Sequence, residues 1–255
     1  MTGTPPAGPT GGSPHGPTGT TTARARSQGE RARGPWALKD LLVLAVLGAV
    51  FGFLYWALVQ AWGALQVLMG PFGDLAQNAL MGGWIVVAPL AVFIVRRPGA
   101  GVVAEIAAAF VEFAFLGSPV GPMLLLAAFV QGAGAEVAFA LTRYRRYGWG
   151  TFLASGVTGV TANFVYAATM FSWWTQDLLA LRIGLQLAGG LLLCGVLGKL
   201  LADALLRTGV LDGFAPGRDA ARLEARARAA AGRPAAARAD DDAPVGPGGD
   251  VRARG

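Results

Sequence analysis

Cysteine, histidine and charged residues are scarce in this chain of 255 residues. The single cysteine, Cys194, allows no disulfide within the chain and no cysteine-based metal cluster. The single histidine, His15, lies in a segment rich in glycine, proline and threonine, where nothing positions it. Charged residues make up only 14% of the chain, which is too few to hydrate the surface of a soluble domain. The composition therefore excludes most metal-dependent and triad enzymes.

Catalytic and nucleotide-binding motifs are missing as well. The chain contains no GxxxxGK[ST] phosphate loop, no HExxH, no GxSxG, and no second histidine to activate a serine. We therefore expect no enzyme activity and no cofactor in this chain, and an ATPase would have to be a separate subunit. The net charge of +6 reflects membrane topology and not nucleic-acid binding, because lysine and arginine lie mostly in the tails and short loops.

Hydrophobic residues, in contrast, make up 54% of the chain and form six long apolar stretches. The stretches cover residues 38–65, 75–95, 100–116, 123–141, 149–171 and 178–206. Each is close to the roughly 20 residues that a helix needs to cross a bilayer. The pattern predicts an all-α integral membrane protein in which six transmembrane helices pack as one domain over residues 36–214.

The two terminal segments have a different composition. Residues 1–35 are rich in glycine, proline and threonine, and residues 215–255 are biased toward alanine, arginine, aspartate, glycine and proline. Neither segment contains enough large apolar side chains to bury, so we expect disordered, low-complexity termini. A short helix over residues 219–231 on the membrane surface is the alternative for the second tail.

The polar segments next to the apolar stretches alternate along the chain: one contains lysine or arginine, and the following one contains neither. One set of breaks carries Lys39, Arg96, Arg97, Arg143, Arg145, Arg146 and Arg207. The breaks at 69–74, 117–122 and 172–177 contain neither residue type. The positive-inside rule then predicts a multi-pass protein of the plasma or inner membrane with both termini in the cytoplasm.

Carboxylates inside the predicted spans each need an explanation, since a charge in a membrane helix costs several kcal/mol unless it is paired or neutralised. Glu105 and Glu136 are expected near the cytoplasmic ends of their spans, where ion pairs with arginine are as good an explanation as ligand binding. Glu112 lies two turns from Glu105 on the same helix face, near the outer end, and the adjacent loop has no lysine or arginine. Glu112 is therefore the stronger ligand candidate.

Amides and aromatic residues accompany these carboxylates in the outer halves of the spans, and Gln77 and Gln186 are among them. A carboxylate balances positive charge, amides pair with ring nitrogens, and aromatic faces stack on a heterocycle or attract a cation. The mixture suits a small, planar, polar or cationic ligand. The predicted substrate-binding residues are Glu112, Gln131, Trp84, Asn78, Asn163, Tyr166, Glu136, Gln60 and Trp56. Hydrogen bonding between helices is the alternative role of each amide.

Two further features concern charge and small residues. Arg182, at the start of the last span, is expected to be an interfacial anchor or a ligand contact, and Lys199 is expected to pair with Asp203 one turn away. The first span carries small residues at helical spacing, which form a smooth stripe that another helix can approach closely. This stripe consists of Ala45, Ala49, Gly48 and Gly52.

Four segments resemble a known family. They are RRPGAGVVAEIAAAFVE at 96–112, GSPVGP at 117–122, QGAGAEVAFALTRYRRYG at 131–148 and RTGVLDGF at 207–214. Together they resemble the YkoE family of substrate-binding S components in energy-coupling factor (ECF) transporters, over residues 36–214. The resemblance implies a six-helix S component that binds thiamine or its hydroxymethylpyrimidine precursor from outside.

In such systems a transmembrane T component and two cytoplasmic ATPase subunits supply the energy from ATP, and the S component topples in the membrane to release its cargo. The resemblance also implies that Ala45 and Ala49, as an AxxxA stripe, contact the T component. An autonomous cation-coupled carrier of a small polar solute, with Glu105, Glu112 and Glu136 as a relay, is the alternative. The small-residue stripe and the lack of an inverted repeat favour the S component, and a membrane-embedded enzyme is disfavoured by the missing metal ligands.

Overall fold

The computed structural model describes residues 36–231, and its longest helix is α2 (Leu38–Met69). Asp40 defines the start of α2, because its carboxylate accepts a hydrogen bond from the N–H of Ala37 (3.3 Å) and lies 3.3 Å from Nε of Arg97. A negative charge in the first turn also interacts favourably with the helix dipole. The arginine of a distant turn thus helps to fix where the first span begins.

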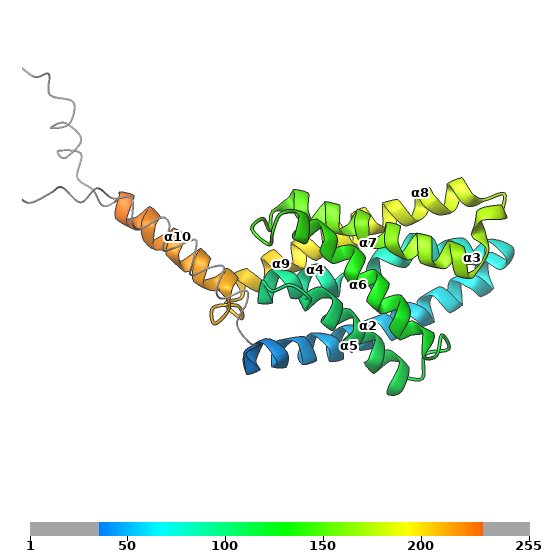
Figure 1. Ribbon diagram of the computed structural model, residues 1–255, viewed down its shortest axis with the longest axis horizontal. Helices are drawn as coiled ribbons and strands as arrows, with labels where there is room; N and C mark the ends of the chain where they lie inside the picture. The colour runs from blue at the N-terminus through cyan, green and yellow to red at the C-terminus, as the bar shows by residue number, and fades with distance from the viewer. Residues whose placement is uncertain (1–35, 232–255) are drawn as a thin grey trace, which may run out of the picture.

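The helices that follow α2 form a bundle whose neighbours run back and forth along its length (Figure 1). In chain order they are η1 (Gly70–Phe72), α3 (Gly73–Leu80), η2 (Met81–Trp84), α4 (Val87–Val95), α5 (Ala100–Ala114), α6 (Met123–Leu141), α7 (Trp149–Met170), η3 (Trp173–Thr175), α8 (Leu179–Gly189), η4 (Gly190–Val196), α9 (Leu197–Arg207) and α10 (Ala215–Ala231). Helix α2 packs on α5, α5 on α6, and α6 on α7. Helix α4 is buried along its whole length and forms the centre of the bundle.

Large apolar side chains cover the outside of the bundle. Leu38, Val67 and Leu141 are 82%, 84% and 79% exposed. A soluble protein rarely exposes so many such residues, whereas a lipid-facing surface requires them. Within residues 36–231, four helical segments are long and apolar enough to cross a membrane: Leu38–Met69, Gly73–Val95, Met123–Leu141 and Leu179–Arg207. Helices α5 and α7 are not among them, so the count of six spans stays a prediction.

Two of the spanning segments are interrupted, and the interruptions lie against each other. Between α3 and α4 the chain forms the 3₁₀ turn η2, and between α8 and α9 it forms the π-helix η4. A Cβ atom on Gly82 would lie 2.1 Å from the carbonyl oxygen of Gly189, and one on Gly189 would lie 2.2 Å from that of Ala79. Only glycine allows the two backbones to approach this closely. The glycines therefore hold both breaks together inside the bundle.

The basic turns gather at one end of the bundle. Arg96 contacts the ring of Tyr147 (4.6 Å to the ring centroid) and pairs with Asp219, while Nζ of Lys39 lies 3.5 Å from the carbonyl oxygen of Gly213. The predicted pair of Lys199 and Asp203 is confirmed nearby on α9. These contacts bring the start of α2, the 96–99 turn, the 142–148 loop and the 208–214 turn together. The side of the membrane that this end faces stays a prediction.

Residues 215–231 differ from the predicted low-complexity tail, because they form helix α10. Alanine and arginine are strong helix formers, and Arg222 and Arg228 lie 3.6 Å and 3.5 Å from Asp219 and Glu224 on the preceding turn. Of the two predictions for this segment, the short helix over 219–231 therefore agrees better with the structure than the low-complexity tail does. Residues 1–35 and 232–255, predicted to be disordered, lie outside the described residues.

Because the two interrupted segments approach closely, we expect alanine substitutions at two glycines of α8 to affect the thermal stability differently. Gly189→Ala places a methyl group against backbone that cannot move aside, which typically costs about 1–3 kcal/mol. Gly184→Ala is the matched control, since a Cβ there meets nothing within 4 Å. Thermal unfolding of the detergent-purified protein should show a lower Tm for Gly189→Ala and an unchanged or higher Tm for Gly184→Ala. Equal Tm values for the two variants would contradict the described packing.

Candidate substrate-binding site

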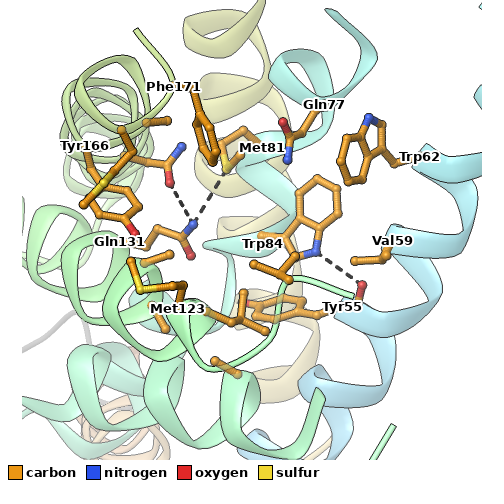
Figure 2. A pocket seen from close by; sticks show the side chains of 18 of the residues that line it. Tyr55, Val59, Trp62, Gln77, Met81, Trp84, Met123, Gln131, Tyr166 and Phe171 are labelled. Carbon is orange, nitrogen blue, oxygen red and sulfur yellow. Dashed lines mark hydrogen bonds between the residues drawn. The ribbon is translucent and has the colours of Figure 1, made fainter. Parts of the chain in front are cut away.

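A cavity of about 740 Å³ lies between the helices at the end of the bundle opposite the basic turns (Figure 2). Its walls come from α2, α3, η2, α5, α6, α7 and the segment around η3. The aromatic lining residues are Tyr55, Trp62, Trp84, Tyr166, Phe171 and Trp173, and the polar ones are Gln66, Asp74, Gln77, Glu105, Glu112, Gln131, Asn163 and Gln176. Among the lining residues three are carboxylates and none is lysine or arginine.

The floor of the cavity is built around Glu105. Its Oε1 atom accepts hydrogen bonds from the hydroxyl of Tyr55 and from the backbone N–H of Ala88, each at 3.2 Å. The hydroxyl of Tyr55 in turn accepts a bond from the N–H of Val87 (3.3 Å), and Nε1 of Trp84 donates to the carbonyl of Tyr55 (3.2 Å). The first turn of α4 therefore donates to this carboxylate directly, through the N–H of Ala88, and indirectly, through the N–H of Val87 and the hydroxyl of Tyr55. Helix N-termini stabilise anions in this way. These bonds take the place of the ion pair with a cytoplasmic arginine that the sequence suggested for Glu105.

Glu112 lines the same cavity two turns further along α5. Its Oε1 atom accepts a hydrogen bond from the hydroxyl of Ser118 (2.8 Å), in the loop that follows α5. The Oε2 atom is buried and has no hydrogen-bond partner within residues 36–231. A buried carboxylate oxygen without a donor costs about 1–3 kcal/mol or more. A ligand that supplies a donor or a positive charge removes this penalty.

An amide pair from α6 and α7 forms another part of the cavity wall. Nε2 of Gln131 donates to Oδ1 of Asn163 (2.9 Å) and lies 3.9 Å from the sulfur of Met81 (Figure 2). The Nδ2 group of Asn163 is buried and unpartnered within residues 36–231. The lining residues therefore include one with an unpartnered donor, Asn163, and one with an unpartnered acceptor, Glu112, which suits a ligand that carries both kinds of group.

Arg182 contacts two residues of the outer cavity wall, Asp74 and Trp173. Its Nη2 atom lies 2.7 Å from Oδ2 of Asp74, and its guanidinium group stacks on the ring of Trp173 (4.7 Å to the centroid). Asp74 and Trp173 line the cavity, but Arg182 does not. The structure thus gives Arg182 a role that differs from both expectations, since it joins α3, α8 and η3 behind the cavity wall.

The structure brings five of the predicted site residues together in the cavity: Glu112, Gln131, Trp84, Asn163 and Tyr166. Two others on α2 do not reach it. Gln60 is exposed on the outer face of the helix, and Trp56 stacks on Phe53 (5.8 Å between centroids). Depth in the membrane was the basis for both predictions, and depth does not determine which face of a helix a residue occupies.

Asn78 and Glu136 also lie outside the cavity. Nδ2 of Asn78 donates to the carbonyl of Asp74 on its own helix (3.2 Å). Glu136 lies at the basic end of the bundle, where Oε1 accepts bonds from the N–H of Gly99 and from the hydroxyl of Tyr144 (2.9 Å). Burial, together with Glu136, raises the pKa of Tyr144, so this hydroxyl stays a donor at neutral pH. Glu136 thus caps the N-terminus of α5, because its carboxylate accepts hydrogen bonds from backbone N–H groups there.

Several cavity residues were not predicted from the sequence. On α2 these are Tyr55, Val59, Trp62 and Gln66. Their spacing of four, three and four residues places them on one helix face, so a periodicity analysis of the first span could have found them. Asp74 and Trp173 lie in the outer turns, and no local pattern distinguishes them.

The small-residue stripe of α2 divides into two parts. A Cβ on Gly48 would lie 2.6 Å from Cβ of Ala107, and one on Gly52 would lie 2.7 Å from the carbonyl oxygen of Ala108. These glycines are therefore used inside the bundle, against α5, and offer nothing to a partner. Ala45 and Ala49 are exposed on the outer face. Gly48 and Gly52 therefore do not belong to the predicted partner surface, whereas Ala45 and Ala49 remain candidates for it.

Known proteins share this fold and sequence. A crystal structure described as an S-component of an ECF transporter superposes with a TM-score of 0.71 at 33% identity, covering 76% of this chain and 98% of that one. A family model described as the permease component of an ABC-type cobalt transport system matches residues 39–162. A protein of Bacillus subtilis (strain 168), named as an HMP/thiamine permease protein, YkoE, is 36% identical over 194 residues, which are 75% of this chain and 96% of that protein.

A helical membrane bundle that encloses a polar cavity, together with these relatives, defines a substrate-binding subunit of a membrane transporter. The chain belongs to the YkoE family of ECF transporter S components.

Proposed function

We propose that this chain captures thiamine or its hydroxymethylpyrimidine precursor from outside the cell and delivers it inward through an ATP-driven partner complex. The name of the Bacillus relative supports this ligand class. The observation that carries the proposal is Glu112, which lines a cavity without lysine or arginine among its lining residues and whose buried Oε2 atom lacks a donor within residues 36–231. Such a site attracts a cationic or amino-bearing aromatic ligand.

The chemistry of thiamine fits the arrangement of the cavity. Its thiazolium ring carries a positive charge, and its aminopyrimidine ring presents donors and acceptors. Glu105 and Glu112 are seven residues apart on one face of α5, or about 10 Å at 1.5 Å per residue. The two carboxylates can therefore serve opposite ends of a two-ring ligand, while Trp84 and Tyr166 offer aromatic faces between them.

Capture from outside follows from the predicted orientation. The cavity lies at the end of the bundle opposite the basic turns, and the positive-inside rule places those turns in the cytoplasm. With six spans, both termini are then cytoplasmic. A T component and two ATPase subunits supply the power stroke, and Ala45 and Ala49 form the exposed part of the surface that meets the T component.

The alternative of an autonomous carrier requires Glu105, Glu112 and Glu136 to act as one relay. Glu105 and Glu112 share the cavity, but Glu136 is bonded to Gly99 and Tyr144 at the other end of the bundle. The arrangement therefore favours a binding subunit.

The role of Glu112 predicts a loss of affinity in Glu112→Gln. The variant keeps the shape of the side chain but removes a charge-assisted hydrogen bond, worth about 1.5–3 kcal/mol, or roughly ten- to a hundredfold in Kd. Calorimetric titration with thiamine and with hydroxymethylpyrimidine measures it. A loss for thiamine alone assigns Glu112 to the thiazolium charge, and a loss for both assigns it to the pyrimidine.

Gln60→Ala is the control for this titration, because Gln60 lies on the exposed face of α2 and should leave both affinities unchanged. Unchanged affinities in Glu112→Gln would remove this residue from the site. If the wild-type protein binds neither ligand, the proposed function itself fails.

The exposed alanines predict a separate effect on assembly. Ala45→Trp or Ala49→Trp holds a neighbouring helix away, since close helix approach in membranes requires small side chains. Ligand binding should stay intact, whereas co-purification with the T component and transport should be lost. Leu192→Trp, at a lipid-facing position that is 61% exposed, is the control for bulk alone. Loss of ligand binding with assembly unchanged would contradict this assignment.

A further inference from the structure

The residues that line the cavity carry negative charge and offer no positive charge to an anionic ligand. They include three carboxylates, Asp74, Glu105 and Glu112, and no lysine or arginine. The buried side-chain donors of the lining residues that lack a partner within residues 36–231 are both neutral, namely Nε1 of Trp62 and Nδ2 of Asn163. An anion that enters such a site loses its hydration and meets like charge, and both effects disfavour binding.

The size of the cavity does not exclude a phosphorylated ligand. Its volume of about 740 Å³ lies in the upper part of the range of about 300–1,000 Å³ that is usual for small-molecule sites. A phosphate monoester of thiamine or of hydroxymethylpyrimidine adds one small group, but this group carries about −1.5 to −2 charges at pH 7. Discrimination between a free alcohol and its phosphate ester therefore depends on charge.

Arg182 places one positive charge behind the cavity wall. The residue is only 7% exposed, and its Nη2 atom lies 2.7 Å from Oδ2 of Asp74. The Nε and Nη1 atoms are buried and have no hydrogen-bond partner within residues 36–231. A guanidinium group binds phosphate well, because it presents several donors in one rigid plane. Arg182 therefore has the chemistry of a phosphate ligand and unused donors, but its charge is paired with Asp74.

The ion pair presents its acidic partner to the cavity. Asp74 lies in the first turn of α3 and lines the cavity, whereas Arg182 is not among the lining residues. The guanidinium group also stacks on the ring of Trp173, which holds it behind the wall. Since the two opposite charges cancel, the pair leaves the negative charge of the other two lining carboxylates uncompensated.

We propose that Asp74 determines the specificity of the site for unphosphorylated ligands, because it masks the charge of Arg182. The inference rests on the proposed function and narrows the ligand class to the free alcohols, thiamine or hydroxymethylpyrimidine. A phosphate ester must then lose its phosphate by hydrolysis before capture. Asp74 acts through Arg182 and is a positioning residue, so its loss changes the choice between two ligands and not only the strength of binding.

The ratio of two dissociation constants tests this role. It is the Kd of thiamine monophosphate divided by the Kd of thiamine, from calorimetric titration of the full-length protein in detergent. At an effective dielectric constant of about 20, a carboxylate without an ion-pair partner, about 10 Å away, opposes a phosphate monoester by roughly a hundredfold. We expect a wild-type ratio of about this size. Asp74→Asn should lower the ratio about tenfold, whereas Asp74→Glu, which keeps the charge, should not.

Variants of Arg182 separate charge from structure. Arg182→Gln leaves Asp74 unpaired, so the ratio should rise above the wild-type value. Asp74→Asn combined with Arg182→Gln removes the ion pair as a whole and should return the ratio to nearly the wild-type value. A pair that only supports the wall would weaken both ligands alike and leave the ratio unchanged in every variant. If Arg182→Gln alone does not fold, the comparison of Asp74→Asn with the double variant still decides between the two roles.

Asp177→Asn is the matched control for the loss of one negative charge. Asp177 is exposed in the segment before α8 and does not line the cavity, so the ratio should stay at the wild-type value. An unchanged ratio in Asp74→Asn, or an equal fall in Asp177→Asn, would overturn the proposal.

The wild-type protein distinguishes failure of this inference from failure of the proposed function. Equal affinities for thiamine and its monophosphate would overturn the inference and leave the proposed function intact. Binding of neither thiamine nor hydroxymethylpyrimidine would contradict the proposed function itself. If only hydroxymethylpyrimidine binds, the same ratio is measured with its phosphate ester and the same outcomes apply.

Discussion

A carboxylate buried among membrane helices must obtain its hydrogen-bond donors from the protein itself, because lipid supplies none. Much of this structure follows from how that requirement is met for Glu105 and Glu112. Glu105 receives donors from Tyr55 and from Ala88 at the start of α4. Helix α4 can begin at that depth only because its span is interrupted at η2, where Gly82 lies against the backbone of Gly189. The floor of the cavity, the broken span and the glycine contact therefore depend on one another.

Glu112 meets the same requirement only halfway, since Ser118 satisfies one oxygen and the other has no donor within residues 36–231. A protein that needed only stability would replace such a group or pair it fully. Glu112 lines a polar, aromatic cavity at one end of a lipid-facing bundle. Irregular backbone and free polar groups at membrane depth are tolerated where they line such a cavity, which is also where transport proteins bind their substrates.

The sequence predicted the apolar segments closely because hydropathy and helix length determine them directly, as the agreement of residues 123–141 with α6 illustrates. Depth and chemistry also selected Glu112, Gln131 and Asn163, which share the cavity. Depth alone could not show that Gln60 faces outward or that Gly48 packs on α5, since both depend on helix rotation. The donors to Glu105 come from residues 17 and 50 positions away, so only the tertiary structure reveals them.

The central claim is that the unsatisfied carboxylate of Glu112 and the aromatic walls around it form the ligand site. An experimental structure of the protein saturated with thiamine tests this most directly. The account predicts density for one ligand inside the cavity, with a nitrogen or the charged ring next to Oε2 of Glu112 and a ring against Trp84 or Tyr166. Stoichiometric binding with the ligand elsewhere and this cavity empty would contradict it.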